Sequence, residues 1–504
     1  VDLLTLTASE LQTLLVDRII TSAEIVELYL AHIAKHNNAG LNLKAIISIA
    51  DRESLSIRAG QLDAERQQGK TRGPFHGDLC TTVEMPTTCG SFAFKRGSAK
   101  KDAKIIKTLN DAGLIIIAKS NLSELGNAKG FGLMAGWSAV GGQVQAHLCL
   151  ATPVELDTQN PYVKGGVEKD GPFFTKSGPG GSSSGSAVAV AAGFAPVSLG
   201  TELDGSIVMP AARSGTYAIK LTPESVDNNG FMPGSPEWDS QGPYAKTTAD
   251  VATLSAILQL RDPGHYLPLH SSWEGLRVGF VDPKLWRSYP SAVELVDGFF
   301  GQTDAATFAA QDKIQELGGK VVRSIPLASW GEITGAMPDF EEMEELFPYQ
   351  LKRLLPGFLH QLNGVPQTLE ALIKFHEEHA DLEFTKRNDN QKGLEDARDT
   401  KLTEELYQRN FKALRAAAAG TLLTMMKDHQ VDVVLGPCDS RTASVGAAAG
   451  FPVGNLPLGF AFFNGRPFSL HVIAPANEEE KIFQVMSAWG LTFPQNVRPP
   501  PQLV

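Results

Sequence analysis

Cysteine is scarce in this sequence, which argues against small cross-linked folds. The 504 residues include four cysteines, Cys80, Cys89, Cys149 and Cys438. Four scattered thiols provide neither a disulfide framework nor the paired spacing of a zinc site. We therefore expect a reducing, intracellular environment, a core large enough to be stable without cross-links, and no metal.

Long apolar runs and excess positive charge are also missing. The least polar stretch, residues 187–200, is too short and too rich in Gly, Ala and Ser to cross a bilayer. Lys and Arg number 45 against 56 Asp and Glu, which gives a formal charge of −11. Nonspecific nucleic-acid binding needs a basic face. We therefore expect no membrane span and no nucleic-acid partner.

The amino-terminal residues show no targeting signal. They lack the basic region and apolar core of a signal peptide, which predicts a cytoplasmic location. The chain begins at Val1 rather than Met, so a trimmed leader is compatible with the sequence. No pattern indicates an oligomeric state.

The composition and patterning that are present are typical of a globular α/β protein. Hydrophobic residues make up 42% and charged residues 20% of the chain. Capping-box patterns at residues 7–10 and 21–24 predict two amino-terminal helices. The β-branched run of residues 114–117 predicts a buried strand. Strand and helix patterns then alternate, which predicts helices layered on a sheet.

Residues 332–430 differ from the rest, because they are charged, helical in pattern and poor in strand signals. They predict a helical insertion on the α/β body. Within them, residues 376–379 read His-Glu-Glu-His, which is similar to a zinc-protease helix. That motif needs histidines four positions apart so that both share a face. Here His376 and His379 are three apart, so we expect a solvated helix face instead.

A Gly- and Ser-rich region, residues 165–205, predicts tight turns or backbone close to a ligand. Inside it, residues 181–185 fit the nucleophile-elbow pattern Gly-x-Ser-x-Gly, with Ser183 at the centre. The strand that should precede an elbow is missing. A loop that presents Ser182 is therefore the favoured interpretation.

A longer constellation surrounds these serines. It consists of Gly180 to Gly193, then Leu199-Gly200-Thr201-Glu202-Leu203-Asp204-Gly205-Ser206-Ile207, Pro210-Ala211-Ala212 and Ile219 to Pro223. These residues resemble the amidase signature family. Ser206 follows Ser182 by 24 positions, the spacing between that family's bridging and nucleophilic serines.

The resemblance covers nearly the whole chain. It extends to residues 85–91, 118–125, 239–250 and 450–468. It implies an α/β fold in which residues 1–504 form a single large α/β/α domain, with a mixed central β-sheet covered by helices. Segment 332–430 would be inserted into this domain.

The resemblance also implies a chemistry. Ser206 is the expected nucleophile, and Ser182, held by a cis peptide bond, is the expected proton relay. The backbone amides of Leu203, Asp204, Gly205 and Ser206 are the expected oxyanion hole.

The expected substrate is a small-molecule amide or ester, with no cofactor. We expect Gly181 and Ser183 to contact it. Seven apolar residues of the helical segment either wall an acyl channel or pack the segment onto the body, and packing is the favoured interpretation. They are Phe347, Leu351, Leu354, Leu355, Phe358, Leu359 and Leu362.

Two departures from the family bear on catalysis. The family places a Lys-Asp pair on a short strand after a His-Gly turn. Here Gly77 is followed directly by Asp78, and no lysine occurs between Lys70 and Lys95. Residues from Val144 to Thr158 look like an insertion. The two departures indicate either an imperfect gene model or a diverged protein.

Three hypotheses follow from these observations. The first is a serine hydrolase of carboxylic amides that acts through Ser206, with weak or absent turnover because the lysine is missing. The second is a non-catalytic pseudoenzyme or binding protein that keeps the fold. The third is a Ser–His–Asp hydrolase built on Ser183.

Overall fold

The computed structural model describes residues 1–77, 79–80, 85–144, 176–287, 296–501 and 503–504. The predicted junction at Asp78 and the predicted insertion after Val144 therefore lie outside the described residues. No helix in the described ranges is long and apolar enough to span a membrane.

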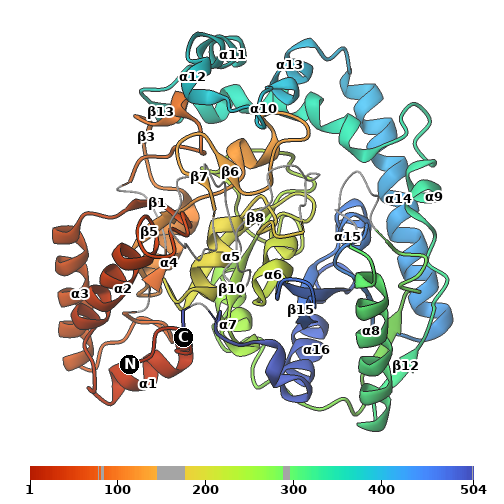
Figure 1. The fold of residues 1–504 in the computed structure, drawn as a ribbon, viewed down its shortest axis with the longest axis horizontal. Helices are drawn as coiled ribbons and strands as arrows, with labels where there is room; N and C mark the ends of the chain where they lie inside the picture. Colours follow the sequence, from red (N-terminus) through yellow and green to blue (C-terminus); the bar gives the residue numbers. More distant parts are fainter. Residues whose placement is uncertain (78, 81–84, 145–175, 288–295, 502) are drawn as a thin grey trace.

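The centre of the molecule is a sheet of eight strands (Figure 1). In spatial order these are β12 (Lys320–Val322), β11 (Arg277–Phe280), β14 (Val433–Pro437), β16 (Pro467–Ile473), β15 (Val453–Phe460), β9 (Tyr217–Lys220), β10 (Ser240–Ala245) and β8 (Val197–Glu202). The pairs β11–β12 and β11–β14 are parallel, and the other neighbours are antiparallel. The mixed central sheet that the sequence predicted is confirmed.

Both faces of the sheet are buried. Along β14, Val433 and Leu435 belong to one core cluster and Val434 to another, because successive side chains of a strand point to opposite faces. Helices α7 (Thr248–Leu258), α8 (Phe299–Glu316) and α16 (Glu479–Thr492) contribute to the first cluster. Helices α14 (Glu404–His429) and α15 (Thr442–Ala449) contribute to the second. The result is the expected three-layer α/β/α arrangement.

The amino-terminal part forms a smaller helical layer beside the sheet (Figure 1). It contains α1 (Ala8–Val16), α2 (Ser22–His36), α3 (Arg52–Gln67) and α4 (Lys104–Asp111), with the pairs β1 (Ile46–Ile49)–β5 (Ala118–Ser120) and β2 (Leu79–Cys80)–β4 (Ile115–Ile116). Both predicted capping boxes are present, with Thr7 and Thr21 as the N-cap residues of α1 and α2.

The segment after β12 is almost wholly helical, as predicted. It contains α9 (Trp330–Thr334), η3 (Met343–Leu346), α10 (Phe347–Leu359), α11 (Leu369–Glu378), α12 (Ala380–Glu383), α13 (Lys392–Asp399) and α14. Its short strand β13 (Leu362–Asn363) pairs with β3 (Ser98–Ala99) of the body. In Figure 1 these helices form the upper and right-hand edges of the molecule.

Two short helices follow the loops that carry the paired serines. Ser182 lies just before α5 (Ser184–Ala191), and Ser206 lies between β8 and α6 (Val208–Ser214). Every residue of α5 is buried. A Cβ on Gly185 would collide with the backbone of Ala45 and Asn121, so the small residues of α5 permit close backbone packing that fixes the loop before it.

Candidate active site

The loops that carry Ser182 and Ser206 are bonded to each other. The backbone N–H of Ser183 donates to the carbonyl oxygen of Ser206 at 3.1 Å. The carbonyl oxygen of Ser182 accepts from the N–H of Ser123 at 2.9 Å, which ties this loop to the segment after β5. The peptide bond between Gly181 and Ser182 is cis.

Each of the two serine loops contains a glycine at a position that disfavours a side chain. A Cβ on Gly181 would collide with the hydroxyl of Ser123. Gly205 has φ of 75°, in the left-handed region that favours glycine. Side chains at either position would displace the loops that hold the serines.

Ser182 and Ser206 both line a cavity of about 1280 Å³. The two side chains are largely buried, with the serine residues 4% and 9% exposed. No hydrogen bond joins the two hydroxyls, both of which belong to described residues. The structure thus brings the predicted nucleophile and relay to one cavity without linking them directly.

Glu202 anchors the loop that carries Ser206, a role that the sequence analysis missed. Its Oε2 accepts from the backbone N–H of Ile207 at 2.6 Å and of Val208 at 3.0 Å. Burial raises the pKa of Glu202, whereas the charge of Lys220 and the amide donors lower it. An acidic residue four positions before the expected nucleophile, at the end of a buried strand, was the available signal.

Tyr244 of β10 supports the same loop from the sheet. Its hydroxyl donates to the carbonyl oxygen of Ile207 at 3.0 Å, and the residue is fully buried. The backbone that follows Ser206 is therefore held by buried polar groups.

The backbone amides before Ser206 are mostly unengaged. Within the described part of the chain, the N–H groups of Leu203, Asp204 and Ser206 donate to no protein acceptor. The N–H of Gly205 interacts with the Glu202 carboxylate. Three of the four amides that the sequence analysis assigned to an oxyanion hole thus have no protein acceptor among the described residues.

The hydroxyl of Ser183 bonds to the backbone of a neighbouring strand. Its Oγ donates to the carbonyl oxygen of Thr201 at 3.2 Å and accepts from the N–H of Thr201 at 3.1 Å. These bonds tie α5 to β8. Among the described residues, no hydrogen bond joins Ser183 to a histidine, so the geometry gives the Ser–His–Asp hypothesis no base.

Two partly buried carboxylates, those of Asp204 and Asp239, also line the cavity. Burial raises the pKa of Asp204 to about 6 and that of Asp239 to about 7. Asp204 accepts from the hydroxyl of Ser444 at 2.9 Å. Asp239 accepts from the N–H groups of Gly234 and Ser235 at 2.8 and 2.9 Å.

His76 and Lys119, two basic side chains that are candidates to replace the missing lysine, bind other parts of the chain. The ring of His76, beside the predicted junction, contacts the carbonyl oxygen of Leu62 at 2.8 Å and accepts from the N–H of Arg72 at 3.1 Å. Lys119 donates to Met85 and Thr87 at 3.1 and 2.8 Å, and burial lowers its pKa to about 8. Neither His76 nor Lys119 lines the cavity.

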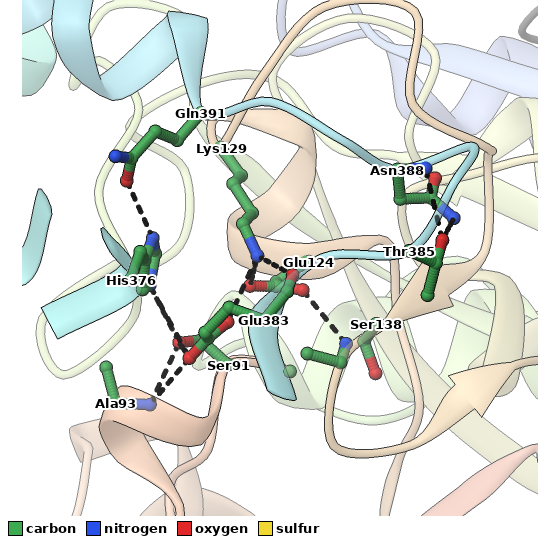
Figure 2. Close-up of polar contacts among 12 residues, drawn as sticks. Ser91, Ala93, Glu124, Lys129, Ser138, His376, Glu383, Thr385, Asn388 and Gln391 are labelled. Atoms are coloured by element: carbon green, nitrogen blue, oxygen red, sulfur yellow. Dashed lines mark hydrogen bonds and ion pairs between the residues drawn. The ribbon is translucent and has the colours of Figure 1, made fainter. Parts of the chain in front are cut away.

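The expectation of a solvated face for residues 376–379 is wrong for His376. Figure 2 shows this side chain inside a buried polar network. One ring nitrogen lies 3.0 Å from Ser91 Oγ and the other 3.0 Å from Gln391 Oε1. His379 turns away and contacts the carbonyl oxygen of Phe375 at 3.0 Å, so the two histidines do not converge.

The same network contains three side chains that could bind a metal ion, but a lysine ammonium group lies between them. Ligand atoms of Glu124, His376 and Glu383 lie within 4.8 Å of one another. However, Lys129 Nζ bonds both carboxylates, at 2.7 Å to Glu124 and 3.0 Å to Glu383 (Figure 2). The ammonium group takes the place that a cation would need.

The apolar residues of α10 serve both of the predicted roles. The members that line the cavity are Phe347, Leu351, Leu354 and Phe358. Leu355 and Leu359, together with Leu362 of β13, are buried in a cluster with residues of α11 and α13, and Leu351 and Phe358 belong to this cluster as well. Packing alone, the favoured interpretation, was therefore incomplete.

Comparison with known proteins identifies the family of this chain. The family model described as Amidase matches residues 24–131 and 156–483. The stretch that it omits overlaps the segment from Val144 to Thr158. A probable amidase of Arabidopsis thaliana is 27% identical over 499 residues, which cover 96% of this chain and 89% of that protein.

Solved structures show the same similarity. The peptide amidase of Stenotrophomonas maltophilia superposes with a TM-score of 0.82 at 27% identity, over 98% of each chain. An amidase family protein of Bacillus anthracis superposes with a TM-score of 0.82 at 23% identity, over 98% of this chain and 92% of that one, and supports the fold. With most of its length matched, this chain is a member of the amidase signature family.

Proposed function

We propose that this protein is a hydrolase of carboxylic amides that acts through an acyl-enzyme on Ser206, with weak turnover because the family's lysine is missing from its sequence. The supporting observation is that Ser206 lies in a cavity beside Ser182, on a loop held by Glu202 and Tyr244. A hydroxyl needs a base to become nucleophilic, and a bridging serine can pass the proton to one.

In the first step, Ser206 Oγ attacks the amide carbon and passes its proton to Ser182 Oγ, which delivers its own hydroxyl proton to the leaving nitrogen. The C–N bond then breaks, and the amine departs with that proton. In the second step, water attacks the ester carbon, one water proton returns through Ser182 to Ser206 Oγ as the bond to that oxygen breaks, and a carboxylic acid is released. The free amides of Leu203, Asp204 and Ser206 would stabilise the oxyanion in each step.

The rest of the site has a supporting role in this proposal. Gly181 brings the relay loop close, and Ser183 contributes through its bonds to Thr201 rather than through the substrate. We also propose that residues 1–504 form one domain and that residues 332–430 are an insertion in it, which supplies the apolar wall of the cavity.

A fluorophosphonate probe tests the assignment, because it labels an activated serine. Peptide mapping should place the label on Ser206, and the Ser206→Ala variant should not react. A label on Ser183 would support the elbow hypothesis instead. No label at any serine, together with amide binding, would support a pseudoenzyme.

A further inference from the structure

The cavity at Ser206 is much larger than a small amide needs. Its volume is about 1280 Å³, whereas pockets for drug-sized ligands are typically about 300–1,000 Å³. A water molecule takes about 30 Å³, and acetamide is only a few times larger. A short amide would therefore leave most of the apolar wall in contact with water.

One wall is a continuous apolar stripe on α10. Phe347, Leu351, Leu354 and Phe358 line the cavity, and their spacing of four, three and four positions puts them on one face of the helix. The adjacent face of α10 is held in the core by Leu355 and Leu359, both fully buried, and Leu351 and Phe358 of the stripe belong to the same buried cluster. The wall is thus backed by packed structure.

Apolar residues also approach from a second part of the chain. Residues 231–233 and Pro236 line the cavity and read Phe-Met-Pro at the first three positions. Leu125 and Phe131 add to the lining from the segment after β5. An elongated apolar group bound at Ser206 would find contacts on more than one side.

The charge of the lining disfavours an anionic group. Among described lining residues, six are acidic and two are basic. Both basic side chains are paired, Lys104 with Asp227 at 3.0 Å and Arg441 with Glu344 at 2.7 Å. A carboxylate on the acyl group would find every basic side chain among these residues already paired with an acid. An unpaired charge in the bound state disfavours an anionic ligand relative to a neutral one.

We propose that the acyl group bound in this cavity is elongated, apolar and free of anionic groups, and that the α10 stripe sets its preferred length. The inference rests on the proposed function, because the group in this cavity is the acyl group only if Ser206 is the nucleophile. Leu354 is the best position to test it, since it lines the cavity and is only partly buried.

Binding can be measured by calorimetry on the intact chain with acetamide, butyramide, hexanamide and octanamide. Burial of each added methylene should tighten binding up to about fourfold, and we expect affinity to rise at least about 100-fold from acetamide to octanamide.

Adipamic acid, which carries a carboxylate at the far end of a six-carbon amide, should bind at least about tenfold more weakly than hexanamide. Equal affinities along the series would overturn the inference, as would no binding of octanamide.

Variants of Leu354 locate the effect. Leu354→Asp should weaken octanamide binding at least about tenfold and leave acetamide within twofold. Leu354→Trp should shift the preferred length to shorter chains, because it fills space. The matched control is Leu423→Asp on α14, at a leucine that is 47% exposed and outside the cavity lining, and it should change neither affinity. Equal loss for both amides in both Leu354 variants would point to misfolding and overturn the assignment.

Hydrolysis of the same amides, followed by ammonia release, separates the two proposals. Length-dependent binding without ammonia release, both by this chain and by a variant in which the family's lysine-bearing strand is inserted after Gly77, would leave the acyl class standing and refute the proposed function. Ammonia release at rates independent of chain length would support the proposed function and refute the acyl class.

Discussion

The backbone N–H of Ser183 donates to the carbonyl oxygen of Ser206 at 3.1 Å. This bond joins the residue after the expected relay to the expected nucleophile, across 23 positions of sequence. Any change that separates the two loops must break it. Because the bond joins backbone atoms, a substitution of one serine side chain leaves both of its atoms in place. The roles of the Ser182, Ser183 and Ser206 hydroxyls can therefore be tested one at a time.

Substitution of the three serines should give three different outcomes. Ser206→Ala should abolish labelling by the fluorophosphonate and amide hydrolysis, because no other hydroxyl occupies its place. Ser182→Ala should slow labelling further, by less than the factor of about 10²–10⁴ that a complete proton-transfer path contributes, because this chain lacks the family's lysine. Ser183→Ala should keep most of the reactivity, because its hydroxyl bonds the backbone of Thr201 rather than the other two serines.

The labelling rate of each purified variant, with unfolding in urea as the check on folding, measures these effects. Undiminished labelling of Ser206→Ala would refute the nucleophile assignment. A complete loss in Ser183→Ala with native stability would move the chemistry to that residue.

Glu202 should prove to be a positioning residue. Glu202→Ala removes the acceptor of the Ile207 and Val208 amides, and we expect labelling of Ser206 to slow by about 10², as when an oxyanion donor is misplaced. Glu202→Gln keeps an acceptor oxygen and should restore most of the rate. The same loss in both variants would show that the charge of Glu202, rather than its geometry, matters.

Local signals predicted much of the fold. The capping boxes of α1 and α2 place both partners within four residues, so they can be read without tertiary information. The pairing of Ser182 with Ser206 came from the family resemblance, since spacing alone does not reveal that two loops meet.

The errors involve long-range contacts. His376 looked solvated because its sequence neighbours are charged, yet its partner Ser91 is 285 positions away. Likewise, α10 carries apolar residues on two sides, and periodicity cannot tell which side meets a core and which meets a cavity. Such assignments depend on packing that no local pattern encodes.

Lys129 should be essential to stability. Lys129→Met leaves the buried carboxylates of Glu124 and Glu383 without their counter-charge, and breaking a buried pair typically costs about 3–5 kcal/mol. Lys374→Met is the control, because the Lys374–Glu378 pair on α11 is exposed, and it should cost less than about 1 kcal/mol. Urea unfolding of both variants measures the difference. Equal, small losses would show that the network contributes little.

His376 should make stability depend on pH. Burial lowers its pKa to about 4, below the ordinary value of about 6.5. Between these values the unfolded chain binds a proton that the folded chain does not, so the stability present above pH 6.5 is lost as pH falls towards 4. From pH 7 to pH 5 the expected loss from this residue is about 2 kcal/mol.

The matched variant is His376→Gln, which cannot titrate. The difference in unfolding free energy between pH 7 and pH 5 should be smaller for the variant by that amount. Identical pH dependence for both proteins would show that His376 is not held neutral.

The missing base should limit turnover. The family mechanism passes the nucleophile's proton through the bridging serine to a lysine, and here no lysine occurs between Lys70 and Lys95. The ring of His76 is held by backbone partners and does not line the cavity. We therefore expect hydrolysis of simple amides to be absent or very slow, by about 10²–10⁴ or more relative to a protein with the base.

Insertion of a strand should restore that base. A segment of the type Ile-Pro-x-x-x-Lys-Asp-Asn placed between Gly77 and Leu79 should raise ammonia release from octanamide by the same factor. The control is the same insertion with its lysine replaced by methionine, which should leave the rate unchanged. If the unmodified chain turns over amides rapidly, another group has replaced the lysine. Equal gains from both insertions would show that the strand acts through packing rather than through proton transfer.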